Sequence, residues 1–89
     1  MIEFIVVMPR VEGNMEIGYR TEFYSDFKQF TNVDRAISHG MVELDQADDF
    51  LIGKLQGHVL LALQYMHEVR DDPSELVRAA DCLCLGVKS

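Results

Sequence analysis

Hydrophobic and polar residues alternate in two stretches near the start of the chain, which is the pattern of β-strands. β-branched and aromatic residues dominate residues 2–9, and a second alternating stretch covers residues 16–24. A Glu-Gly-Asn segment at residues 12–14 supplies turn-forming chemistry between them. The two stretches therefore predict an antiparallel β-hairpin. Residues 41–44 are interpreted either as a brief third strand or as a plain connection.

The middle of the chain changes to a helical spacing of apolar residues. Asn32 is a candidate N-cap for a short helix over residues 33–39, and Gly40 follows that helix in the position that tolerates left-handed geometry. Asp45 is the candidate N-cap of one long helix over residues 46–69. The apolar stripe that predicts this long helix steps by three and four positions through Ile52, Leu55, Val59, Ala62, Met66 and Val69.

A last helix is predicted to begin at Pro73, directly after the cap residue Asp72, and to end at Gly86. The link between the two long helical stretches is residues 70–72, which is short enough to make them antiparallel neighbours. The predicted fold is therefore α+β. A single domain over residues 1–89 would contain an N-terminal antiparallel β-hairpin packed on an antiparallel helical pair with one long helix.

The predicted long helix carries a second apolar strip on the side opposite its main stripe. This strip consists of Phe50, Gly53, Gly57 and Leu61. Each glycine costs about 1 kcal/mol relative to alanine in a helix interior, a cost that is offset only if another backbone approaches closely. Two interpretations remain open. The last helix covers the strip within the chain, or a second copy covers it in a homodimer.

The chain has 8 basic and 15 acidic residues and a formal net charge of −7. This charge disfavours direct binding to a nucleic-acid backbone and favours a protein partner with a basic surface. The acidic side chains are interpreted either as helix caps and solubilising charges or as partner-binding patches that steer association. They gather in two groups, Glu43, Asp45, Asp48 and Asp49, and then Glu68, Asp71, Asp72 and Glu75.

No catalytic residue, metal site or cofactor is expected from the sequence. His58 and His67 would lie on opposite sides of the predicted helix, and no third or fourth metal ligand has a plausible spacing. Cys82 and Cys84 would lie at a helix C-terminus, which is the wrong end for activating a thiolate. They are also too few and too close for a disulfide framework, which favours a reduced compartment.

The N-terminus lacks the basic region of a signal peptide, and the apolar run at residues 59–63 is far shorter than the ~20 residues of a membrane span. We therefore expect a cytoplasmic protein that makes no contact with a membrane.

A compact, acidic chain without catalytic motifs resembles, at the level of class, the small inhibitors carried by phages and mobile elements. Anti-CRISPR and anti-restriction proteins are examples, and bacterial toxin immunity proteins are similar in size and charge. The resemblance implies a non-catalytic inhibitor or regulator in the host cytoplasm, which blocks a basic, nucleic-acid-handling protein by acting as a nucleic-acid mimic. The alternatives are a homodimeric structural or assembly module that pairs through the long helix, and a toxin immunity protein.

Overall fold

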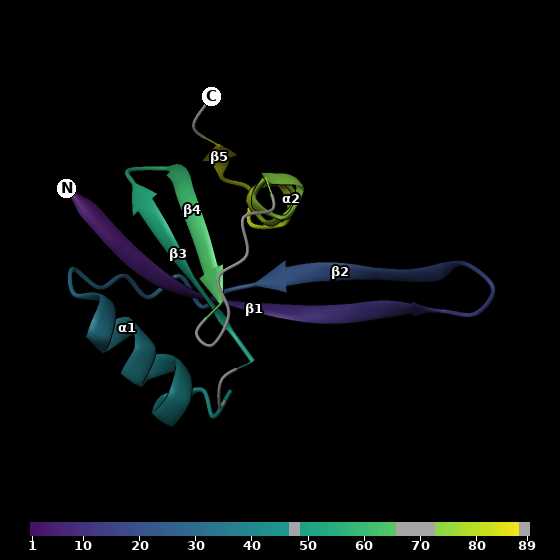
Figure 1. Cartoon of the computed structure of the whole chain (residues 1–89), viewed down its shortest axis with the longest axis horizontal. Helices are drawn as coiled ribbons and strands as arrows, with labels where there is room; N and C mark the ends of the chain where they lie inside the picture. Colours follow the sequence, from purple (N-terminus) through teal and green to yellow (C-terminus); the bar gives the residue numbers. More distant parts are fainter. Residues whose placement is uncertain (47–48, 66–72, 88–89) are drawn as a thin grey trace.

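The computed structural model describes residues 1–46, 49–65 and 73–87, and this part of the chain forms a curled five-stranded sheet with helices on both faces (Figure 1). The strand order is β2-β1-β3-β4-β5, and neighbours pair antiparallel except β4 and β5, which are parallel. The elements in chain order are β1 (Ile2–Asn14), β2 (Gly18–Tyr24), α1 (Val33–Ser38), the π-helical turn η1 (His39–Glu43), β3 (Leu51–Gln56), β4 (Val59–Tyr65), α2 (Pro73–Cys82) and β5 (Gly86–Val87).

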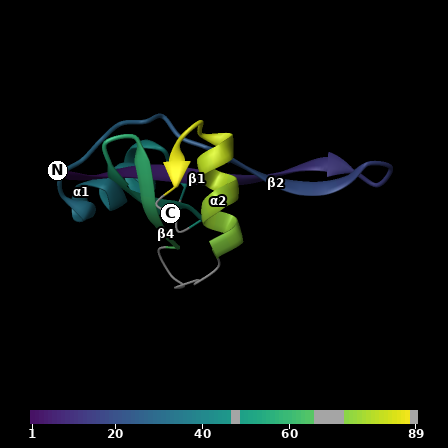
Figure 2. The same ribbon diagram turned by 90° about the horizontal axis from the view of Figure 1, so that it is seen from above.

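β1 is a long strand that changes its partner half-way along. Residues 2–7 pair with β3, whereas residues 8–14 pair with β2. The second half of β1 and the whole of β2 therefore leave the body of the protein as a two-stranded ribbon, which both views show projecting to one side (Figures 1 and 2).

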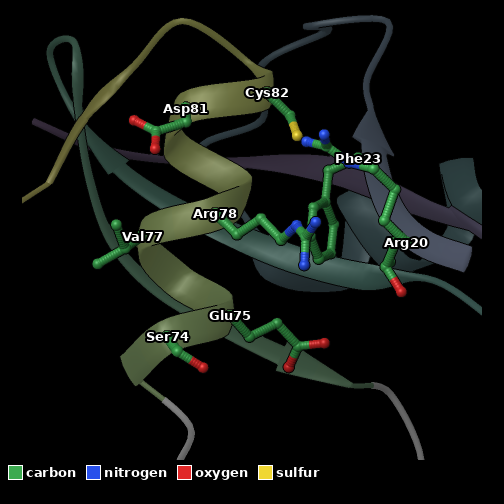
Figure 3. A pocket seen from close by; sticks show the side chains of 9 residues that line it. Arg20, Phe23, Ser74, Glu75, Val77, Arg78, Asp81 and Cys82 are labelled. Atoms are coloured by element: carbon green, nitrogen blue, oxygen red, sulfur yellow. The ribbon is translucent and has the colours of Figure 1, made fainter. Parts of the chain in front are cut away.

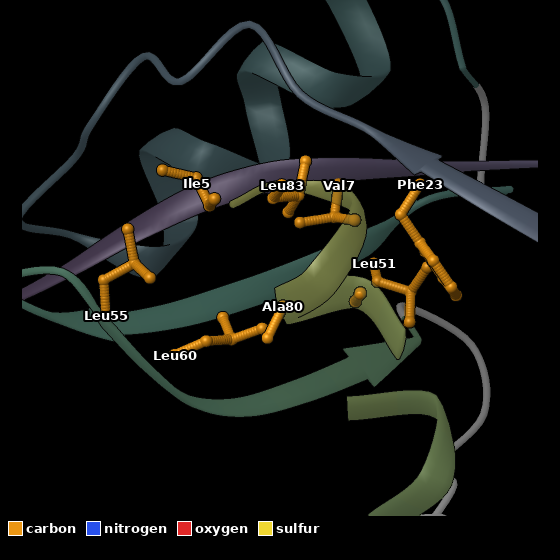
Figure 4. Close-up of a cluster of buried hydrophobic side chains, with 9 residues drawn as sticks. Ile5, Val7, Phe23, Leu51, Leu55, Leu60, Ala80 and Leu83 are labelled. Carbon is orange, nitrogen blue, oxygen red and sulfur yellow. The ribbon is translucent and has the colours of Figure 1, made fainter. Parts of the chain in front are cut away.

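Two hydrophobic clusters lie on opposite faces of the sheet. Strand alternation sends Ile5 and Val7 to one face and Val6 to the other, so both faces of this part of β1 are apolar. The first cluster packs against α2 (Figure 4) and consists of Ile5, Val7, Phe23, Leu51, Leu55, Leu60, Ala79, Ala80 and Leu83. The second packs against α1 and consists of Val6, Ala36, Phe50 and Ile52.

The predicted long helix over residues 46–69 is wrong, because the described part of that stretch forms a β-hairpin. β3 and β4 pair around a two-residue turn, Gly57-His58. Gly57 has φ 62°, whereas His58 has no positive φ, which is the geometry of a type II′ turn with glycine in its first central position. The fold is therefore dominated by the sheet, and the predicted antiparallel helical pair does not form.

The apolar stripe that predicted a helix mixes residues from both faces of this hairpin, because Ile52 packs in the cluster against α1 and Leu55 in the cluster against α2. A β-bulge adds a further helical spacing. Lys54 pairs with Ala62 but the next residue pairs with Leu60, so Leu61 is an extra residue in β4. The bulge places both Leu60 and Leu63 on the α2 side of the sheet. Two inward residues are thus three positions apart instead of two, which is a helical step.

Other elements follow the sequence more closely. A hairpin of β1 and β2 forms, but only residues 8–14 of β1 pair with β2, and its loop is residues 15–17 instead of the predicted 12–14. Asn32 caps α1 as predicted, by accepting a hydrogen bond from the N–H of Asp34 at 2.8 Å. Helix α2 begins at Pro73 as predicted. However, the α1 segment does not stop before Gly40 but continues as η1, so residues 41–44 are not a strand. Asp45 has φ 51° and caps no helix.

Helix α2 ends in a Schellman motif centred on Cys84, not at Gly86. The N–H of Leu85 donates to the carbonyl of Ala80 at 2.7 Å, and the N–H of Cys84 donates to Asp81 at 3.2 Å. Cys84 adopts φ 58°, a region that glycine occupies at much lower cost.

We expect the substitution Cys84→Gly to raise the free energy of unfolding by about 0.5–1 kcal/mol, because it removes left-handed strain from an L-residue. Urea unfolding under reducing conditions measures this change. Cys84→Ala is the matched control, since alanine removes the thiol but keeps the strain. An equal gain in both variants would contradict the explanation.

A second prediction concerns the close packing of Gly40 against Phe50. A Cβ at Gly40 would lie 2.7 Å from ring carbons of Phe50, which is fully buried. We expect Gly40→Val to lower the free energy of unfolding by about 2–3 kcal/mol through overpacking. Ser38→Val introduces the same side chain at an exposed position of α1 and should cost less than about 1 kcal/mol. Similar losses in both variants would show that valine disturbs the helix and not the packing.

Candidate functional site

The ribbon formed by residues 8–24 is the most exposed part of the sheet. Every residue from Arg10 to Arg20 is exposed to solvent. Four of them are large apolar side chains, and the exposed fractions are 72% for Val11, 91% for Met15, 80% for Ile17 and 64% for Tyr19. Contiguous apolar surface of this kind is typical of interaction sites on proteins.

Local sequence builds the tip of the ribbon. The side-chain carbonyl of Asn14 accepts hydrogen bonds from the N–H groups of Glu16 and Ile17 at 2.9 and 3.0 Å. Gly18 then adopts φ 84°, which closes a three-residue loop. A Cβ at Gly13 would lie 2.1 Å from the carbonyl oxygen of Gly18, so the close approach of the strands here requires glycine.

The two faces of the ribbon differ in chemistry. On one face the polar groups satisfy one another: the Tyr24 hydroxyl donates to Glu12, Arg20 pairs with Glu22, and the Arg10 guanidinium lies 5.7 Å from the Tyr24 ring centroid. The hydrogen bond to Glu12 raises the pKa of Tyr24 above its ordinary value.

The opposite face continues the hydrophobic core outwards. Val11 faces Thr21 across the strands, Tyr19 faces Gly13, and both pairs lie on the same side as the buried Phe23. The ribbon thus presents a bare apolar face, backed by a polar face whose groups already have partners.

A cleft of about 510 Å³ lies where α2 meets the base of the ribbon (Figure 3). Its walls come from two elements far apart in sequence. Arg20, Thr21 and Phe23 of β2 line one side, and Ser74, Glu75, Val77, Arg78, Asp81 and Cys82 of α2 line the other.

Cys82 joins the two walls of this cleft. Its thiol donates a hydrogen bond to the Glu22 carboxylate at 2.9 Å. The nearby backbone N–H of Phe23 acts to lower the pKa of this thiol. Burial raises the pKa of the Cys82 thiol, and the bond to Glu22 raises it further. The same thiol bond holds the pKa of Glu22 below its usual value, against the effect of burial. The thiolate form that a nucleophile needs is therefore disfavoured.

A second polar cluster is centred on the buried side chain of His39. Its Nδ1 lies 2.7 Å from Glu43 Oε2, its Nε2 lies 2.6 Å from Asp26 Oδ2, and the Phe30 ring centroid lies 5.2 Å away. Each ring nitrogen of His39 thus lies within hydrogen-bond distance of a carboxylate oxygen. The cluster ties the segment after β2 to η1, and its groups are occupied by one another.

Asp26 gives a pH-dependent prediction. Burial acts to raise the pKa of Asp26, but the hydrogen bonds from His39 and from the N–H of Lys28 outweigh it, so the pKa lies below its ordinary value. The stabilisation from ionised Asp26 is therefore present above the unfolded-state pKa of about 3.9 and is lost as pH falls through the lower folded-state value.

We expect Asp26→Asn to lose less stability between pH 7 and pH 3 than the wild-type protein, as measured by urea unfolding at each pH. The exposed Asp49 is the control, and Asp49→Asn should keep the wild-type profile. If Asp26→Asn loses as much stability between pH 7 and pH 3 as the wild-type protein, Asp26 is not the source of this pH dependence.

The acidic residues singled out in the sequence lie in different surroundings. Glu43, Asp45 and Asp49 are exposed in η1 and in the segment between η1 and β3, although Glu43 is already bound to His39. Glu75 lines the cleft beside the ribbon. The remaining members, Asp48, Glu68, Asp71 and Asp72, lie outside the described residues.

The four residues of the predicted apolar strip do not share a surface. Phe50 is fully buried, and Gly53 is buried among Ile5, Val7 and Leu60. Gly57 forms the exposed hairpin turn, and Leu61 is the partly buried bulge residue. The helical face that would have united them does not exist, so pairing of two copies through that helix has no basis.

Sequence reasoning missed the exposed residues of the ribbon and the two arginines of the cleft. The spacing of Gly13 and Gly18 around a three-residue loop could have indicated that the hairpin is paired up to its tip. No local sequence pattern predicts the cleft, because its walls are joined by a contact between residues 60 positions apart.

No family model matches the chain, and no curated protein or solved structure matches it either. Among the helices of the described residues, none is long and apolar enough to cross a membrane. Within the same residues, no group of three or more histidine, cysteine and acidic side chains could hold a metal ion.

Proposed function

We propose that the protein is a non-catalytic protein-binding module, an inhibitor or regulator that contacts a partner protein with a basic surface. The observation that carries this proposal is the projecting ribbon with its bare apolar face. An isolated two-stranded ribbon is marginally stable in water, so an exposed one with four large apolar side chains is suited to insertion into a partner.

The charge of the chain supports the choice of partner. A net charge of −7 attracts basic surfaces and repels acidic ones, and Glu12 and Glu16 are exposed beside the apolar tip. Proteins that handle nucleic acids carry basic surfaces of this kind. We therefore expect the ribbon to bind an apolar groove on the partner that is bordered by arginine or lysine side chains.

The chemistry of the cleft supports a non-catalytic role. Its thiol is held in the protonated form by burial, which raises the pKa of Cys82, and by Glu22. The two carboxylate contacts of His39 likewise occupy both ring nitrogens. The titratable groups with close contacts are thus engaged in holding elements of the fold together.

The test uses the tagged full chain to capture a partner from the native host lysate, followed by affinity measurements on the purified pair. We expect Ile17→Asp to weaken binding by about tenfold or more, because it places a charge among the exposed apolar side chains of the ribbon. Val42→Asp is the matched control, since Val42 is 77% exposed on η1, away from the ribbon. The affinity of the wild-type pair should also fall as salt concentration rises.

Failure to capture any partner would count against the proposal, as would equal binding by both variants. Binding that is insensitive to salt would remove the basic surface from the description of the partner.

A further inference from the structure

The outer edge of β2 has backbone groups that point away from the sheet. Pro9 lies opposite Phe23 across the ribbon and has no N–H, so this pair cannot exchange two hydrogen bonds. Hydrogen-bonded and non-hydrogen-bonded pairs alternate along an antiparallel ladder. The N–H and C=O groups of Tyr19, Thr21 and Phe23 therefore all face outwards from β1.

Only one of these three positions is covered. Phe23 packs in the cluster against α2, and its N–H is near enough to the Cys82 sulfur to act on the pKa of that thiol. β2 is an edge strand, and no hydrogen bond within the described part of the chain uses the outward groups of Tyr19 or Thr21. Four backbone groups are thus available to a further strand.

The cleft lies directly beside this open edge. Its α2 wall contributes an apolar side chain, Val77, which is 49% exposed, and a guanidinium, Arg78. Figure 3 shows the Arg78 side chain extending from α2 towards β2. Arg20 pairs with Glu22, and the positive charge of Arg78 also acts to lower the pKa of Glu22. Arg78 is in none of the close ion pairs among the described residues.

We propose that this corner binds an extended peptide segment of the partner, which adds as a short strand to the edge of β2 at Tyr19–Thr21 and places a carboxylate against Arg78. Main-chain hydrogen bonds supply affinity in this mode of binding, and alternate side chains supply specificity. The occupant is therefore an extended segment with an acidic side chain. This inference rests on the proposed function and specifies how the partner is held.

The experiment uses a phage-displayed library of random linear seven-residue peptides, selected on the full wild-type chain. The selected peptides are expected to carry an acidic residue at a fixed position. Thr21→Pro removes an outward N–H without removing a bond of the β1–β2 ladder, and it should weaken these peptides about tenfold or more. Thr21→Val is the matched control, because valine keeps the outward N–H and changes only the side chain. An equal loss of affinity in both variants would assign the effect to the side chain and contradict strand addition.

Arg78→Glu is a second variant, at an exposed residue of α2. It tests whether the corner binds an acidic peptide even if Thr21→Pro does not fold. We expect it to replace the acidic preference of the selected peptides with a basic one. Absence of any enriched peptide, or peptides that bind all variants equally, would overturn the proposal. Wild-type dimers at micromolar concentration that Thr21→Pro abolishes would overturn it too, because a second copy would then occupy the edge.

The two proposals fail in distinguishable ways. A captured host partner that depends on Ile17 but not on Thr21 or Arg78 would overturn strand addition and leave the protein-binding function standing. Enriched peptides without any host partner would leave the edge site standing and overturn the proposed function.

Discussion

The division of the hydrogen bonds of β1 between two partners determines the arrangement of the sheet, and Pro9 determines where the division falls. The nitrogen of Pro9 faces away from β2, on the side where β3 pairs with residues 2–7. Because proline has no N–H to donate, the ladder with β3 ends at Val7, and the ladder with β2 takes over from Met8. A single missing donor thus separates the body of the protein from its ribbon.

Because of this separation, the two halves of β1 differ in how far they are buried. The first half is buried on both faces, between the α1 and α2 clusters. Beyond Pro9, β1 has neither helix over it, so the side chain of Val11 stays in solvent. The return of the chain to the body is fixed by the bridge between Phe4 and Phe30, whose two backbone hydrogen bonds measure 2.7 and 2.9 Å, and by the carboxylates around His39.

The parts of the fold that sequence predicted are those with local causes. The cap at Asn32 and the start of α2 at Pro73 each depend on a few neighbouring residues. The first hairpin was predicted only in part, because residues 2–7 pair with the distant β3. The long helix was wrong because both faces of the β3–β4 hairpin are apolar, so residues on opposite faces, such as Ile52 and Leu55, matched a helical spacing. Two glycines within one helix were an energetic argument against it. The candidate site was not predictable, because whether an edge is open depends on what the distant α2 covers.

The placement of Cys82 and Pro9 also bears on self-association into fibrils. Cross-β stacking needs uninterrupted segments of roughly six or seven residues. Helix α2 packs against Phe23 at the outer edge of the ribbon and leaves residues 18–22, while Pro9 interrupts the opposite edge and leaves residues 10–14. Each remaining run is too short to template an amyloid stack. The ribbon is therefore exposed to solvent and apolar, but it has no continuous strand edge along which further copies of the chain could polymerise.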